Sequence, residues 1–261
     1  MAMRGAAFAL LLACIVPAAA AEPPFTPGGT AQLRAVADGA TLDLADGRVL
    51  RLVGIDVPLR GALARQAKDA LEGLLAGGAI DLRFAGNPRD RQGRVLAQVY
   101  AGTVWVQGEL IRRGLARVRS TPDDRLGVAE MLALERQARR YRRGLWADPA
   151  YAVVSADAAA KLAGTFQLVS GTILGAAKTS SGIVLRFGPD RSRSLAMLIG
   201  APALKLCREA GLDPLALTGK RVLIRGFIDG SAHPVMAITH PEQIEILRAK
   251  KTAPAKAPGP P

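Results

Sequence analysis

Short runs of alternating apolar and polar residues dominate the first third of the chain after residue 29. Three such runs, over 30–36, 41–45 and 49–55, are separated by two Asp-Gly pairs. Alternation with a period of two predicts half-buried strands, and Asp-Gly between such runs favours tight reversals. We therefore expect these runs to form a three-strand antiparallel meander.

The pattern then changes to a helical period. Apolar residues recur every three or four positions over 62–76, and two glycines follow as a stop signal. Alternation returns over 79–84 and 94–100, and two further helices are predicted over 104–115 and 125–144. Five strands with a helix after the third is the element order of a small closed OB-type barrel.

The second half of the chain repeats this order. Strands are predicted over 165–174, 182–187, 194–200, 220–228 and 234–247, with a short helix near 202–211 between the third and the fourth. The fold class expected is therefore mainly β with helices, in the form of an OB-fold barrel with packed helices followed by a second OB-like barrel.

Composition suggests where these units begin and end. The expected division is a signal peptide over 1–21, a short linker over 22–29, a first domain over 30–147, a small-residue linker over 148–163, a second domain over 164–247, and a disordered Pro/Ala/Lys tail over 248–261.

The N-terminus has the pattern of an export signal. Arg4 precedes an apolar stretch that ends in small residues before Glu22, and the stretch is too short to cross a bilayer. We expect cleavage after Ala21 and a periplasmic or extracellular protein. The alternative is a lipoprotein anchored at Cys14. No later run predicts a transmembrane segment.

The chain is strongly basic. It holds 35 Lys and Arg against 22 Asp and Glu, and without Arg4 of the expected signal the balance is 34 against 22, a net charge of +12. Such a chain attracts nucleic acid, anionic lipid or acidic polysaccharide. The densest basic cluster, from Arg136 to Arg143, is explained equally well as the solvated face of a helix.

Cysteine usage indicates no disulfide framework in the mature chain. Only Cys207 remains once the expected signal is removed, and its expected role is core packing. One cysteine with His233 and His240 does not predict a zinc site.

Five motifs occur in order over about 110 residues. They are "DGAT" (38–41), "LRLVGIDVP" (50–58), "DRQGRVLAQVY" (90–100), "LIRRGLARV" (110–118) and "RRGLW" (142–146). In this order they resemble the staphylococcal nuclease (thermonuclease) family. The second half resembles the OB-like domain appended to some bacterial relatives. The resemblance implies an SNase-like fold and a calcium-dependent phosphodiester hydrolase.

The resemblance also implies roles for individual residues. Family members place two arginines on the phosphate, hold calcium with two aspartates, and use a glutamate as the general base. Arg51 and Arg94 match the arginines, and Asp56 matches the second calcium aspartate. Ala40 stands at the position of the first calcium aspartate, and Leu59 at that of the glutamate. One carboxylate holds calcium poorly, so only weak calcium binding is expected.

We therefore expect an anion-binding site with impaired catalysis. The candidate nucleic-acid contacts are Arg51, Arg94 and Arg60, which follows Leu59 in the sequence. Gln92 replaces a tyrosine that the family often has, and the tyrosines that often follow its "GLA" segment are missing here. Base stacking at this site is therefore not predicted.

Three interpretations remain open at this stage. The first is a secreted protein that binds nucleic acid or another phosphate-bearing polyanion with little or no hydrolysis. The second is an active metal-dependent nuclease that uses another carboxylate. The third is a cell-envelope scaffold whose charge serves lipid or glycan. Ala40 and Leu59 favour the first interpretation over the second.

Overall fold

The computed structural model describes residues 23–189, 194–229 and 233–247. The expected signal peptide over 1–21, with Cys14, and the expected tail over 248–261 lie outside the described residues. No helix within the described ranges has the length and apolar character needed to cross a membrane.

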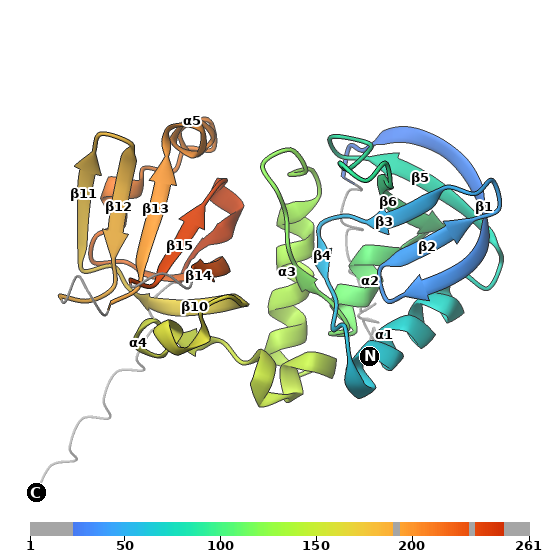
Figure 1. The fold of residues 1–261 in the computed structure, drawn as a ribbon, viewed down its shortest axis with the longest axis horizontal. Helices are drawn as coiled ribbons and strands as arrows, with labels where there is room; N and C mark the ends of the chain where they lie inside the picture. The colour runs from blue at the N-terminus through green and yellow to red at the C-terminus, as the bar shows by residue number, and fades with distance from the viewer. Residues whose placement is uncertain (1–22, 190–193, 230–232, 248–261) are drawn as a thin grey trace, which may run out of the picture.

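Two curled β-sheets lie side by side with helix α3 between them (Figure 1). The first sheet and its short companion pair use the strands β1 (Thr26–Asp38), β2 (Thr41–Leu44), β3 (Val49–Leu52), β4 (Ile55–Asp56), β5 (Ala79–Phe84), β6 (Val95–Ala101), β7 (Val104–Trp105) and β8 (Arg117–Val118).

The first sheet closes into the expected five-strand barrel. β1 bends so that its first half pairs with β5 and its second half with β2. β2 pairs with β3, β5 pairs with β6, and a parallel pairing of β3 with β6 closes the ring. Alternate positions such as Leu50 and Leu52 are buried in the barrel core, while Arg51 between them points to the opposite face.

The second sheet repeats the same connections. Its strands are β9 (Val154–Ser155), β10 (Phe166–Thr172), β11 (Gly175–Thr179), β12 (Gly182–Arg186), β13 (Ala196–Gly200), β14 (Arg221–Asp229), β15 (Val235–Ile238) and β16 (Ile244–Ile246). β10 and β11 together correspond to the bent first strand, because β10 pairs with β14 and β11 with β12. β13 and β15 form the parallel pair. The OB-like order expected for this half is thus present.

Five α-helices and five 3-10 helices are described. They are α1 (Gly61–Leu74), α2 (Val106–Arg112), α3 (Val128–Arg140), α4 (Ala156–Ala159), α5 (Ala201–Glu209), η1 (Gly144–Ala147), η2 (Pro149–Tyr151), η3 (Ala160–Leu162), η4 (Pro214–Leu217) and η5 (Pro241–Gln243). Cys207 on α5 is buried in the second core, as its expected packing role requires.

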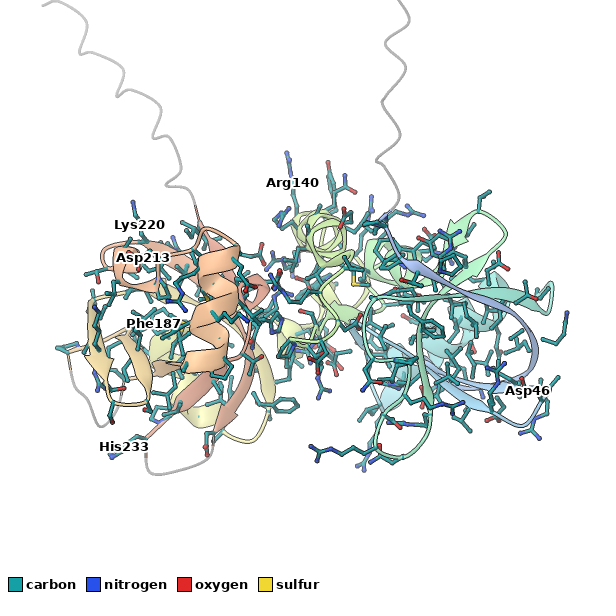
Figure 2. All side chains as sticks on the ribbon, turned by 90° about the horizontal axis from the view of Figure 1, so that it is seen from above. Asp46, Arg140, Phe187, Asp213, Lys220 and His233 are labelled. Atoms are coloured by element: carbon teal, nitrogen blue, oxygen red, sulfur yellow. The ribbon has the colours of Figure 1, made fainter. Side chains whose placement is uncertain are left out.

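A buried ion cluster joins α3 to the second sheet. The Arg225 side chain is 1% exposed, and its Nη1 lies 2.9 Å from Glu135 Oε2. Its other terminal nitrogen donates to Glu245, which also pairs with Arg139. Glu135 Oε1 accepts from the backbone of Val118 at 2.8 Å. Viewed from above, α3 is seen end on between the two bodies (Figure 2).

The segment 148–163, expected as a linker, contains η2, β9, α4 and η3. β9 pairs in parallel with β10, and Ala156 and Ala159 are buried in the second core. At the other end of the chain, β1 begins at Thr26, inside the expected linker 22–29, because Thr26 pairs with Phe84 across β5.

A second polar contact crosses between the two halves. The Ser120 hydroxyl lies 2.7 Å from His240 Nε2, and Arg125 forms a bidentate pair with Glu242. Burial lowers the pKa of His240 to about 4, so the ring is neutral at pH 7. The described cores are therefore joined by specific hydrogen bonds and ion pairs as well as by apolar packing.

Candidate nucleic-acid interface

Strand β3 presents Arg51 on the outer face of the first barrel. Its Nη1 lies 3.1 Å from Thr41 Oγ1 and 3.5 Å from Asp38 Oδ1, on the neighbouring strands β2 and β1. The side chain is 21% exposed. Burial lowers the pKa of this guanidinium, Asp38 opposes that effect, and the positive charge of Arg94 lowers it further. Arg51 thus stands in a region of concentrated positive charge.

Arg94 is positioned by the turn that precedes β6. Asp90 opens this turn, and its carbonyl accepts from Gly93 at 3.0 Å. The Asp90 carboxylate accepts from the Arg94 backbone at 2.9 Å and from Arg94 Nε at 2.7 Å. The pairing with Asp90 holds Arg94 in this turn and leaves its guanidinium beside Arg51.

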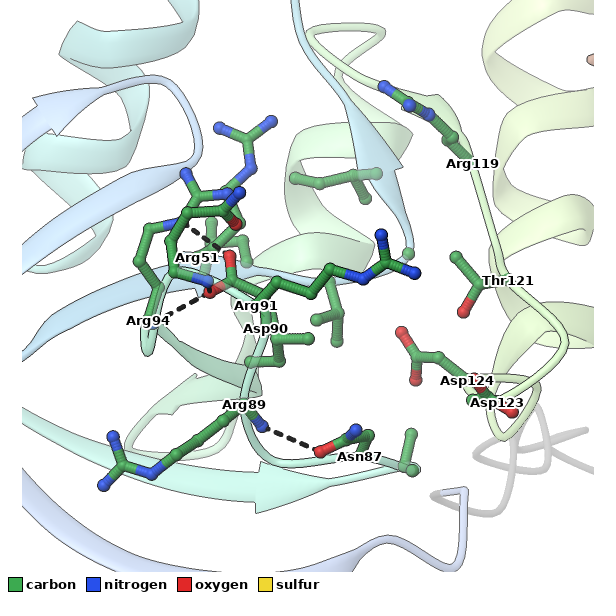
Figure 3. A pocket seen from close by; sticks show the side chains of 18 residues that line it. Arg51, Asn87, Arg89, Asp90, Arg91, Arg94, Arg119, Thr121, Asp123 and Asp124 are labelled. Carbon is green, nitrogen blue, oxygen red and sulfur yellow. Dashed lines mark hydrogen bonds and ion pairs between the residues drawn. The ribbon is translucent and has the colours of Figure 1, made fainter. Parts of the chain in front are cut away.

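A pocket of about 760 Å³ opens beside these two arginines. Figure 3 shows Arg51, Arg91 and Arg94 on one side and Thr121, Asp123 and Asp124 on a facing loop. The charged lining residues are five arginines (51, 89, 91, 94 and 119) and three aspartates (90, 123 and 124), a formal balance of +2. The pocket therefore favours an anionic ligand.

The two loops of this pocket meet at Gly86. A β-carbon at that position would collide with the carbonyl oxygen of Asp123. Glycine therefore permits the loop before β6 to lie against the loop after β8, and residues of both loops line the pocket.

Asp124 differs from the other pocket carboxylates. Its Oδ1 is buried and accepts no hydrogen bond from the part of the chain that the structure describes. Burial raises its pKa to about 6. Asp124 is consequently a group that can exchange a proton near neutral pH.

Asp56 points to arginines rather than into an open cation site. Its Oδ2 accepts from Arg117 Nη2 at 2.6 Å, and its Oδ1 lies 3.6 Å from Arg119 Nη1. Ala40, at the matching position of the first calcium aspartate, is 0% exposed and packs in the first core. These residues do not fit a calcium ion, which takes six to eight oxygen ligands. Across residues 23–189, 194–229 and 233–247, no three His, Cys, Asp or Glu side chains gather as metal ligands.

The remaining sequence candidates lie apart from the pocket lining. Leu59 is 79% exposed, and Arg60 is exposed at the residue before α1. Neither belongs to the residues that line the pocket. Of the candidate site residues, the structure thus brings Arg51 and Arg94 together, places Asp56 close by on β4, and leaves Arg60 outside.

Three side chains at or beside the pocket were not predicted from the sequence. Arg119 and Asp124 line the pocket from the segment after β8, and Arg117 neutralises Asp56. All three come from a segment more than sixty residues beyond Asp56, so no local spacing connects them with it. Antiparallel pairing of β4 with β8, in which Asp56 faces Arg117, is what brings them together.

A closed OB-type barrel with a basic pocket beside its β3 and β6 strands defines a protein of the OB class, whose members include binders of oligonucleotides and oligosaccharides. The family model described as "Staphylococcal nuclease homologue" matches residues 49–148. The chain belongs to the staphylococcal nuclease family.

Curated relatives agree with this assignment. An "Uncharacterized endonuclease" of Escherichia coli is 36% identical over 120 residues, which cover 43% of this chain and 74% of the relative. A "Micrococcal nuclease" of Shigella flexneri is 32% identical over 130 residues, 44% of this chain and 71% of the relative. A "Probable staphylococcal-like nuclease CAN1" of rice (Oryza sativa subsp. japonica) is 33% identical over 99 residues, 38% of this chain and 28% of the relative.

Proposed function

We propose that this protein is exported and binds nucleic acid through the phosphates, with little or no phosphodiester hydrolysis. The observation that carries the proposal is the pocket in which Arg51, Arg94 and Arg119 lie together in a family of nuclease-like proteins. Guanidinium groups bind phosphate oxygens by charge-assisted hydrogen bonds, and clustered arginines strengthen this attraction.

The arrangement around Asp56 argues against efficient phosphodiester hydrolysis. Metal-dependent phosphodiester cleavage needs oxygen ligands that hold the metal ion. It also needs a nucleophilic water, which is activated by a general base or by the metal ion. Asp56 is held by Arg117, Ala40 offers no oxygen, and Leu59 offers no base. The arginines keep their ability to bind phosphate without these groups.

Binding of a labelled single-stranded oligonucleotide, measured by fluorescence anisotropy at several salt concentrations, tests the proposal. We expect steep salt dependence in the unmodified chain. The double variant Arg51→Ala/Arg94→Ala should bind about 10- to 100-fold more weakly at low salt, and its log–log salt slope should fall by about 1.4, because about 0.7 is lost for each phosphate contact.

The matched control is Arg65→Ala/Arg140→Ala, which removes the same charge from exposed helix positions outside the pocket. Alanine favours helix, so this variant should fold and bind nearly as the unmodified chain does. Equal losses in the two double variants would mean that net charge alone drives binding. No binding to any nucleic acid, with binding to anionic vesicles instead, would favour the cell-envelope interpretation.

Asp124 supports a second candidate function, an active phosphodiesterase that uses this carboxylate as its base. A base with a pKa near the working pH is effective, and Asp124 lines the same pocket as Arg51 and Arg94. If this function holds, cleavage will rise with pH through about 6, and Asp124→Asn will abolish it without weakening binding.

A further inference from the structure

One aromatic ring of the second barrel remains half exposed next to the pocket. On β14, alternate residues face the first barrel, and Leu223 and Arg225 on that face are buried by it. Phe227 is the next residue on the same face and is 50% exposed. Close burial between the two halves therefore stops after Arg225, and the Phe227 ring lies at the edge of their contact.

The ring is held in place by neighbours from both halves. Phe166 on β10 is its cross-strand partner, with ring centroids 5.7 Å apart in an edge-on arrangement. Arg119 lies over the ring, with its Cζ 4.8 Å from the centroid. Phe227 is thus a positioned aromatic side chain rather than a loose surface one.

Arg119 connects this ring to the phosphate-binding pocket. It contacts Phe227 and also lines the pocket, and its charge acts on Arg51 there. A ligand bound at Arg51 and Arg94 therefore meets Arg119 next and then the exposed ring. A basic groove combined with aromatic side chains is an arrangement by which proteins bind single strands.

We propose that Phe227 stacks a base of a single-stranded nucleic acid whose phosphates lie on Arg51, Arg94 and Arg119. This inference rests on the proposed function and adds the strand class and the part played by the second barrel. A base in a duplex is stacked on its neighbours and shows no free face, so the ring selects unpaired strands.

Two other apolar side chains of the second barrel do not offer the same site. Phe187 is 6% exposed and packs in the second core. Leu174 is more exposed than Phe227 but has no π-face, and it lies in the turn between β10 and β11. Leu174 is therefore a suitable control position in the same barrel.

The test compares two labelled oligonucleotides of equal length and charge, oligothymidine and its abasic counterpart, in anisotropy titrations with the full mature chain. The unmodified chain should bind oligothymidine about 5- to 150-fold more tightly than the abasic strand, the range expected for one stacked base. Phe227→Ala should remove this preference without weakening abasic binding. Phe227→Trp should keep it, and Leu174→Ala should leave it unchanged.

The outcomes separate the inference from the proposed function. Equal binding of both strands by the unmodified chain overturns the stacking role and leaves phosphate binding standing. A preference for oligothymidine that survives Phe227→Ala places the stacking elsewhere and also overturns it. Binding of neither strand overturns the proposed function and this inference together. The comparison of strands on the unmodified chain does not depend on any variant folding.

Discussion

Two carboxylates near the pocket have opposite surroundings. Asp56 is neutralised by Arg117 at 2.6 Å, whereas Asp124 Oδ1 is buried and accepts no hydrogen bond from the described residues. The charge of the pocket therefore depends on pH through Asp124, because its pKa of about 6 lies just below neutrality. Phosphate binding should strengthen as Asp124 becomes protonated.

Replacement of Asp124 by Asn should raise stability above pH 6. The folded pKa of about 6 exceeds the ordinary aspartate pKa of 3.8, so the folded state binds more protons than the unfolded state between these two values. The unfolding free energy of the unmodified chain therefore falls, relative to Asp124→Asn, as pH rises from about 4 to about 6. The difference above pH 6 should be on the order of 1–3 kcal/mol, measured by denaturant unfolding at each pH.

The unfolding free energies of the unmodified chain and of Asp124→Asn must be compared at each pH, because His240 changes stability with pH in the opposite direction to Asp124. Its lowered pKa of about 4 makes the folded state lose stability as pH falls from about 6.5 to about 4. Asp124→Asn leaves His240 unchanged, so its effect cancels. A difference that does not vary between pH 4 and 7 would contradict the buried, ionising carboxylate described for Asp124.

At the residue scale, the sequence led to the two pocket arginines and not to their surroundings. Arg51 and Arg94 lie in motifs whose neighbours also match the family, and the fold brings them together. Arg60 lies two residues after the motif that contains Arg51, at the residue before α1, and it does not line the pocket. Phe227 received no role from the sequence, because its exposure depends on where the contact between the two halves thins out and leaves no mark on the local sequence.

Helix α3 is the element on which both halves depend. Glu135 lies on its buried face and meets Arg225 from β14 and the backbone of Val118 from β8. The Oε2 contact is an ion pair rather than an aligned hydrogen bond, since this atom has no hydrogen-bond partner within the described chain. Removing one member of a buried pair leaves an uncompensated charge, which is costly.

Glu135→Gln should therefore destabilise the protein by about 3–5 kcal/mol, because it keeps the side-chain shape and removes the charge beside Arg225. Denaturant unfolding of the full chain measures this cost. Arg136→Ala, which breaks an exposed pair of the same helix with Glu245, should cost less than about 1 kcal/mol. A cost for Glu135→Gln no larger than this control would show that α3 does not depend on the buried charge.

Elements with a clear hydrophobic period were predicted well. Strands whose position depends on pairing with another strand, and which have no period of their own, were not predicted. The expected helix over 62–76 is α1 (Gly61–Leu74), and the strand over 79–84 is β5. β11 was missed because "GAAKT" has no apolar alternation, and its place is given by pairing with β12. β4 and β8 are two residues long, too short for any periodic signal, although their pairing assembles the site.

At the scale of the whole molecule, two barrels with the same strand connections have different roles. The first carries the arginine pocket, and the second carries Phe227 at the edge of the contact between them. Arg119 contacts Asp56 of the first barrel and the Phe227 ring of the second barrel. In the proposed complex the strand has its phosphate contacts on one barrel and its base contact on the other.

The central claim is binding without efficient hydrolysis, and one measurement tests it most directly. A 5′-labelled single strand is incubated with a stoichiometric amount of the mature chain in calcium or in EDTA, bound fraction is read by anisotropy, and strand integrity by denaturing gel. We predict equal binding in both conditions and an intact strand throughout. Calcium-dependent cleavage by the unmodified chain that disappears in Asp56→Ala would contradict the account.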